Sequence, residues 1–140
     1  MKEVRFTVHG DPVPKARPRV VNGHAYTPRK TSIHEKKIGL VYKSEYHGDM
    51  FEIGKPLSVE ADFYMKIPKS TSKRKSDLMV NDEIRPTVKP DTDNLIKTVL
   101  DALLKIAYAD DNQVVELLGR KHYSEEPRTE IRIKEISREE

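Results

Sequence analysis

Residues 89–123 decide the fold of this chain, and they read KPDTDNLIKTVLDALLKIAYADDNQVVELLGRKHY. The stretch opens with two aspartates one residue apart, Asp91 and Asp93, and carries a second acidic pair further along, Asp110 and Asp111. Between the two pairs lies a run of apolar residues with helical spacing. No other part of the chain places so many carboxylates beside so much apolar sequence.

Apolar spacing predicts a buried amphipathic helix over residues 93–104. The apolar side chains recur at i, i+3, i+4 and i+7, and they are Leu95, Ile96, Val99, Leu100, Ala102, Leu103, Leu104 and Ile106. The polar face carries Asp93, Lys97 and Asp101 at intervals of four residues. Pro90 disfavours a helical conformation at the residue before it, so the helix is expected to begin after this proline.

The two aspartates at the start can act together only if Asp91 lies outside the regular helix. Residues two apart in a helix point about 200° away from each other. Asp91 is therefore expected to precede or cap the helix, a position that suits aspartate. Residues 107–113 are expected to form a turn and residues 114–118 a strand, so Asp111 lies where helix gives way to strand.

Clustered carboxylates of this kind are the oxygen ligands that Mg²⁺ takes in proteins. A bound ion can activate water and neutralise charge on a phosphodiester, and Lys97, one turn after Asp93, can stabilise the same charge. The alternative is structural, because such aspartates also cap helices and occupy turns. An EF-hand is disfavoured, since Ile96 and Ala102 stand where its loop requires glycine and glutamate.

This stretch resembles the RusA family of Holliday-junction resolvases, which is common in phages and prophages. The family pattern is approximately D-x-D-N-L-x-K, then D-A-L, then D-D-x-Q-V. The matching residues are Asp91, Asp93, Asn94, Leu95, Lys97, Asp101, Ala102, Leu103, Asp110, Asp111, Gln113 and Val114. The sequence GDPVPKARPR of residues 10–19 is also similar, whereas residues 66–88 match least well.

The resemblance implies a homodimeric endonuclease that cuts four-way DNA junctions symmetrically with Mg²⁺, or with Mn²⁺ in its place. It implies catalytic roles for Asp91, Asp93, Lys97 and Asp111, of which the three aspartates hold the metal. Two other interpretations stay open at this point. One is a broader nuclease that acts on flaps, forks and other branched DNA, and the other is a non-catalytic DNA-binding protein.

Length and composition limit the number of domains, the kinds of metal site and the compartments that this chain can have. A length of 140 residues predicts a single domain over residues 1–140. With 36% hydrophobic and 35% charged residues, a small core lies beside a highly charged surface, which favours a homodimer. The absence of cysteine excludes disulfides and cysteine-based zinc sites. No apolar run resembles a signal peptide or membrane span, so a cytoplasmic protein without a membrane partner is expected.

Residues 10–19 are expected to form a stiff basic arm. Three prolines disfavour an ordinary helix or a central strand there. In an extended chain Lys15, Arg17 and Arg19 share one face, which suits contacts with DNA phosphates; a solvated loop is the alternative. Further DNA contacts are expected from Lys73, Lys75 and Lys89.

The remaining elements complete an α/β fold of the α+β kind, a mixed sheet of about four to five strands with two to three helices. Strands are expected at residues 3–9, 57–65, 113–123 and 129–136, and a hairpin or loop at residues 20–29. Helices are expected from Thr31 or Ser32 to about Tyr46 and from a cap at Ser70–Ser72 to about Val80. The inward side of the first helix should carry Ile33, Ile38, Val41 and Tyr42. Residues 81–88 are expected to be a mobile loop.

Chain geometry leaves open how Asp111 meets the Asp91–Asp93 pair. A helix over residues 93–104 spans about 16 Å, and residues 105–111 can cover at most roughly 23 Å. Within one chain the carboxylate can return to the pair only if this segment doubles back nearly taut. Otherwise it meets the pair of a partner subunit.

Overall fold

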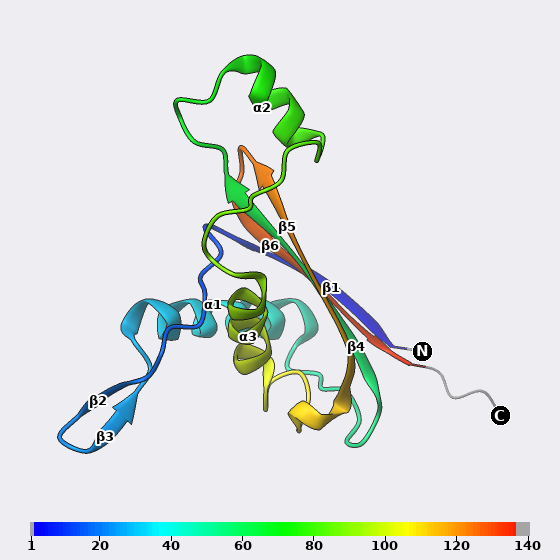
Figure 1. Cartoon of the computed structure of the whole chain (residues 1–140). Helices are drawn as coiled ribbons and strands as arrows, with labels where there is room; N and C mark the ends of the chain where they lie inside the picture. The colour runs from blue at the N-terminus through cyan, green and yellow to red at the C-terminus, as the bar shows by residue number, and fades with distance from the viewer. Residues whose placement is uncertain (1, 137–140) are drawn as a thin grey trace.

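The computed structural model describes residues 2–136, which form a four-stranded sheet with helices packed against it (Figure 1). The strands are β1 (Glu3–His9), β4 (Leu57–Lys66), β5 (Val114–Ser124) and β6 (Arg128–Glu135), in the order β1-β6-β4-β5. β5 runs parallel to β4, whereas β6 is antiparallel to both of its neighbours, β1 and β4. The predicted mixed sheet is confirmed, with strand ends within one residue of those expected.

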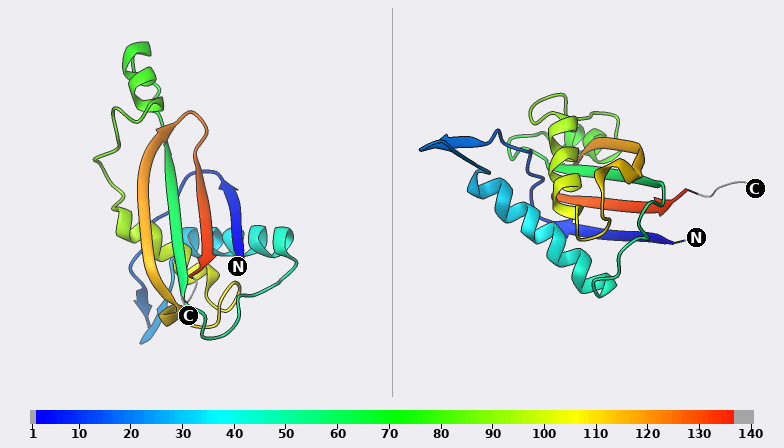
Figure 2. Two further views of the ribbon diagram at one scale, coloured as in Figure 1. Left: turned by 90° about the vertical axis from the view of Figure 1, so that its right-hand side faces the viewer. Right: turned by 90° about the horizontal axis from the view of Figure 1, so that it is seen from below.

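Helices α1 (Arg29–Tyr46) and α3 (Thr92–Leu103) pack on the sheet and on each other (Figure 2). The short helix α2 (Lys73–Val80) projects beyond the ends of β4 and β5 (Figure 1). A single 3-10 turn, η1 (Asp111–Gln113), leads directly into β5. In the part of the chain that the structure describes, no helix has the length and apolar character needed to cross a membrane.

The burial pattern of β4 explains why helices cover only one face of the sheet. Alternate residues of this strand are fully buried, and they are Leu57, Val59, Ala61 and Phe63. The intervening side chains point to the open face, which is polar. On the covered face α3 approaches β5 so closely that a Cβ atom added to Gly119 would lie 2.2 Å from Cδ1 of Ile96. Glycine at this position therefore lets α3 sit against the edge of the sheet.

Helix α1 differs from the prediction at its first turn. It begins at Arg29 after Pro28, which makes no side-chain capping bond, and not after Thr31 or Ser32. Ile33 was expected on the inward side, which is wrong, because 54% of its surface is exposed. Thr31 and His34 face inward instead. Ile33 lies two residues from Thr31, about 200° further around the helix, and so points outward.

The predicted elements around the acidic stretch are confirmed. Ser72 caps α2, since its Oγ accepts a hydrogen bond from the Lys75 N–H at 3.3 Å. Asp91 is the extended residue immediately before α3, as the spacing of the two aspartates required. The helix itself spans residues 92–103, against an expected 93–104.

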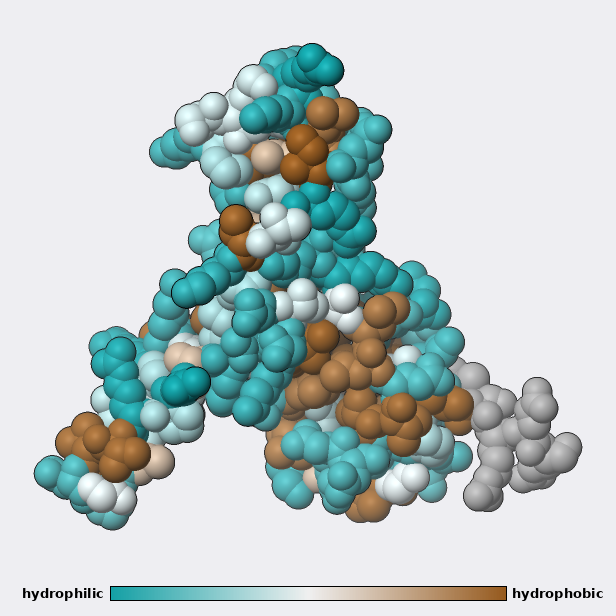
Figure 3. Space-filling view, viewed as in Figure 1, coloured by the Kyte–Doolittle hydropathy of each residue, from teal (hydrophilic) through white to brown (hydrophobic). Residues whose placement is uncertain are grey.

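Strands β2 (Arg19–Val21) and β3 (His24–Tyr26) form a separate hairpin that extends away from the sheet (Figures 1 and 2). Asn22 and Gly23 connect them with φ angles of 52° and 80°. Two consecutive positive φ values are those of the type I′ turn that Asn-Gly favours. All six strand residues are exposed, and apolar side chains gather at the tip of the hairpin (Figure 3).

Candidate active site and nucleic-acid interface

The start of α3 presents two carboxylates that make few hydrogen bonds to the helix. Asp91 is the N-cap residue, but its side chain makes no capping hydrogen bond. Asp93 lies in the first turn, where its Oδ1 accepts a hydrogen bond from the N–H of Asn94 at 2.9 Å. Lys97 is exposed one turn further along. Both aspartates are exposed, so their remaining oxygens are accessible to a cation or to water-mediated contacts.

The two aspartates of the second acidic pair have different contacts. Asp110 caps η1 and forms a reciprocal capping box with Gln113. The buried amide of Gln113 accepts from the N–H groups of Ala109 and Asp110 and donates to the carbonyls of Glu52 and Lys55. These bonds fix the turn before β5. Asp111, between the two, is exposed.

The environment of Asp111 opposes its negative charge. Partial burial is the largest cause that raises the pKa of this carboxyl, followed by the nearby carboxylates of Asp101 and Asp110, while Lys105 acts in the opposite direction. A cation bound beside Asp111 would relieve this repulsion. The neighbour of Asp111 on α3 is thus Asp101, in the last turns of the helix, and not the pair at its start.

Asp91, Asp93 and Asp111 do not form a common cluster in the single chain. Among residues 2–136, no three acidic, histidine or cysteine side chains are arranged to hold a metal ion. η1 follows the C-terminal end of α3, whereas the Asp91–Asp93 pair lies at its N-terminal end (Figure 1). The chain between α3 and η1 does not double back toward the start of the helix.

The basic arm lies directly against α3. The backbone N–H of Lys15 donates to the Asn94 carbonyl at 2.9 Å. Its ammonium pairs with Asp101 at 3.0 Å and with Glu35 at 3.2 Å. Burial alone would lower the pKa of Lys15, but hydrogen bonds to Asp101 and Glu35 raise it overall. Lys15 therefore joins the arm to both helices, and its charge is neutralised within the protein.

The other predicted DNA contacts are exposed. Arg17 and Arg19 lie where the arm leads into the hairpin. Lys73 and Lys75 lie on α2, at the opposite end of the molecule, where Lys73 pairs with Asp77 at 3.3 Å. Lys89 is exposed two residues before Asp91. The start of α3 thus lies between two groups of basic residues, one on the arm and one on α2 (Figure 1).

Residues 82–90, called here the strap, connect α2 to α3 and are fastened to β5. The ammonium of Lys121 donates to the carbonyls of Val88 and Pro90, at 2.7 Å and 2.8 Å. Arg85 Nε donates to the carbonyl of Lys121 at 2.9 Å. These contacts hold the backbone immediately before Asp91, so the prediction of a mobile loop needs correction.

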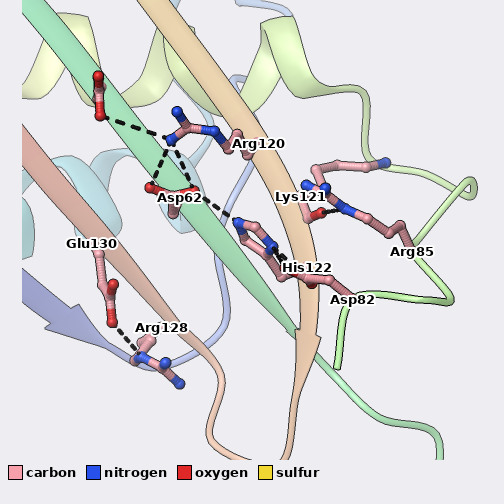
Figure 4. Close-up of polar contacts among 9 residues, drawn as sticks. Asp62, Asp82, Arg85, Arg120, Lys121, His122, Arg128 and Glu130 are labelled. Atoms are coloured by element: carbon pink, nitrogen blue, oxygen red, sulfur yellow. Dashed lines mark hydrogen bonds and ion pairs between the residues drawn. The ribbon is translucent and has the colours of Figure 1, made fainter. Parts of the chain in front are cut away.

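A histidine fastens the other end of the strap. His122 lies between Asp62 of β4 and Asp82 of the strap (Figure 4). Its Nε2 is 2.7 Å from Oδ1 of Asp62, and its Nδ1 is 2.9 Å from Oδ1 of Asp82. These contacts join the ring to β4 and to the strap. Tyr64 stacks on the ring with centroids 4.7 Å apart.

Comparison with known proteins identifies the family. The model of the family described as Endodeoxyribonuclease RusA matches residues 9–134. The chain belongs to the RusA endodeoxyribonuclease family. This match extends from the last residue of β1 to β6, so it includes the arm, the strap, α3 and both acidic clusters. The resemblance of the acidic stretch to the RusA pattern is confirmed. Membership of this family supports endonuclease activity on DNA for this protein.

A curated relative covers nearly the same length. The uncharacterized protein YqaN of Bacillus subtilis (strain 168) is 41% identical over an alignment 140 residues long, which covers 96% of this chain and 97% of YqaN. The two proteins are therefore similar across the whole RusA region.

Proposed function

We propose that this RusA-family protein is a Mg²⁺-dependent endonuclease that resolves four-way DNA junctions by paired symmetrical nicks. The observation that carries the proposal is the start of α3. Asp91 and Asp93 are accessible there, and Lys97 lies one turn along the same helix. Mn²⁺ is expected to substitute for Mg²⁺, because both ions accept oxygen ligands.

The donor chemistry of the three aspartates fits a hard divalent cation. Asp91, Asp93 and Asp111 offer only carboxylate oxygens, and all three side chains are exposed. When bound, such an ion supplies a Lewis acid that lowers the pKa of water and neutralises phosphate charge. Lys97 would place an ammonium next to the same phosphate and stabilise the charge that develops on it. Arg17 and Arg19 would position the DNA through its phosphates.

We further propose that the site is completed between two copies of the chain. β5 is an edge strand of the sheet, and an unpaired edge favours association. Val115, Leu117 and Leu118 are exposed on this strand, and 81% of Ile53 is exposed in the adjoining loop. A second copy bound here would lie next to Asp111, which precedes β5. Asp111 of one copy could then complete a site with the Asp91–Asp93 pair of the other.

A cleavage assay tests the nuclease. Labelled four-way, forked and linear DNA of matched length are incubated with the protein and Mg²⁺, Mn²⁺ or EDTA. We expect paired symmetrical cuts in the four-way junction with either metal and none with EDTA. Equal cleavage of forks and flaps would favour the broader branched-DNA nuclease. Binding without cleavage in any metal would favour the non-catalytic DNA-binding protein.

The same assay tests the assigned residues. Asp91→Asn, Asp93→Asn, Asp111→Asn and Lys97→Ala should each lower the cleavage rate by at least about 10²-fold. The three aspartate variants weaken metal binding, and Lys97→Ala removes the ammonium that stabilises the reacting phosphate. Junction binding, measured by gel shift, should survive. Asp49→Asn, which alters an exposed aspartate outside the arm, the strap and α3, serves as the matched control and should cut normally. Full cleavage by Asp91→Asn would remove this residue from the site.

A further inference from the structure

We propose that the β2–β3 hairpin recognises the branch point of the DNA by placing the exposed side chains of Val20, Val21 and Tyr26 against exposed base faces. This inference rests on the proposed function and deepens it, because it assigns a part of the chain to junction selectivity. The hairpin protrudes from the sheet and carries exposed apolar residues at its end (Figures 2 and 3).

The charge around the hairpin favours nucleic acid as its partner. Residues 12–34 contain no aspartate or glutamate, and their basic residues are Lys15, Arg17, Arg19, Arg29 and Lys30. Lys15 is neutralised by Asp101 and Glu35, but the other four are exposed. The DNA backbone carries the complementary charge. A second copy of the same hairpin would bring like charges together, which disfavours a symmetric contact between hairpins.

The strand register gives the two faces of the hairpin different surfaces. Arg19 pairs with Tyr26 and Val21 pairs with His24, so these four side chains share one face. The opposite face carries Val20, which pairs with Ala25. The exposed fractions of Val20, Val21 and Tyr26 are 69%, 53% and 46%. A two-stranded hairpin this short gains little stability alone, so a partner that covers these residues would also order it.

Exposed bases suit this combination better than an intact duplex does. In a duplex the base faces are stacked on one another, whereas a branch point interrupts the stacking. Apolar and aromatic side chains contact unstacked base faces, and arginines contact the flanking phosphates. The hairpin offers both kinds of group within a few residues of each other.

The base of the hairpin is fixed relative to the candidate active site. Thr31 Oγ1 donates to the Pro14 carbonyl at 3.2 Å and accepts from the Ala16 N–H at 3.4 Å. The Lys15 N–H donates to the Asn94 carbonyl on α3. A branch point held at the tip would therefore lie at a set distance from the carboxylates at the start of α3, which can select the strand position that is cut.

The test compares binding of two DNA forms by variants of these exposed hairpin residues. The triple variant Val20→Ser/Val21→Ser/Tyr26→Ser and the single variant Tyr26→Ala are measured by fluorescence anisotropy in EDTA, with four-way and linear DNA. We expect junction affinity to fall by about tenfold or more in the triple variant, with linear DNA affected under about twofold. Tyr26→Ala should show a smaller loss with the same selectivity. Ile33→Ser/Leu40→Ser, which removes exposed apolar residues of α1, should change neither affinity.

A base analogue reports the contact directly. 2-Aminopurine placed at the branch point should change its fluorescence on binding the wild-type protein, and this change should be lost in the triple variant. An unchanged preference for the junction in both hairpin variants would overturn the proposal. So would dissociation of the triple variant into monomers in sedimentation, which would make the hairpin a contact between copies. A wild-type protein that binds junctions but cuts no DNA would refute the nuclease alone, because the binding comparison would still stand.

Discussion

Asp111 is held in surroundings that disfavour its charged form. Burial and the carboxylates of Asp101 and Asp110 raise its pKa. Asp110 and Gln113 keep it there, because their hydrogen bonds shape the turn before β5. A residue that costs stability in the free protein and is accessible to solvent suits a cation ligand, since the ion offsets the repulsion.

The pH dependence of stability should reveal this cost. The raised pKa means that the folded chain binds a proton at Asp111 more tightly than the unfolded chain does. The contribution of Asp111 to stability is therefore present below the ordinary pKa of aspartate and is lost as the pH rises through the raised value. Asp111→Asn should slightly raise the urea midpoint at pH 7, and the difference should vanish in acid.

The control for this prediction is Asp11→Asn, whose urea midpoint should follow that of the wild-type protein at both pH values. A lower midpoint for Asp111→Asn at pH 7 would contradict the assignment, because it would mean that the ionised carboxylate stabilises the fold.

At the scale of elements, the strap and the arm determine where α3 begins. Lys121 holds the strap at the carbonyls of Val88 and Pro90, and Lys15 holds the arm against the other side of the helix. Gly119 permits α3 to approach β5 closely. The position of Asp91 is therefore determined by contacts from three separate segments of the chain.

Loss of the Lys121 contacts should displace the Asp91–Asp93 pair without unfolding the protein. Lys121→Met removes the ammonium, so the amides of residues 82–90 should exchange faster with deuterium, and junction cleavage should fall by roughly tenfold or more. Lys121→Arg should restore part of the protection from exchange and part of the cleavage rate, because arginine can still donate to the two carbonyls. Lys43→Met on α1 is the matched control. Normal cleavage by Lys121→Met together with fast strap exchange would show that the strap does not position the site.

Local patterns predicted the elements better than they predicted their contacts. The apolar spacing of α3 and the two-residue separation of Asp91 and Asp93 were sufficient to place Asp91 at the cap, because both depend on neighbours in the sequence. The partners of Lys15 and Lys121 were not predictable, since Asp101 and Val88 come near them only after the chain folds. Ile33 was misplaced because it lies five residues before the buried Ile38, which is about 140° around the helix from the inward face.

At the scale of the whole molecule, the single chain carries the parts of the candidate site at two places. The Asp91–Asp93 pair lies at one end of α3, and Asp111 lies beside the other end, next to the exposed edge of β5. Two copies related by a twofold axis could bring the two parts together at two sites. Each site would then face one of the two strands that are nicked in a symmetrical junction. Such an arrangement would account for the paired nicks that we propose.

Mixing two inactive variants tests that arrangement most directly. Asp93→Asn and Asp111→Asn chains carrying different tags are mixed, subunit exchange is verified by sedimentation and native mass spectrometry, and nicking of a four-way junction is measured with Mg²⁺. If the site is shared, a mixed dimer contains one intact centre, and the mixture should nick the junction although neither variant does alone. A mixture that contains mixed dimers and stays as inactive as its components would contradict the shared site.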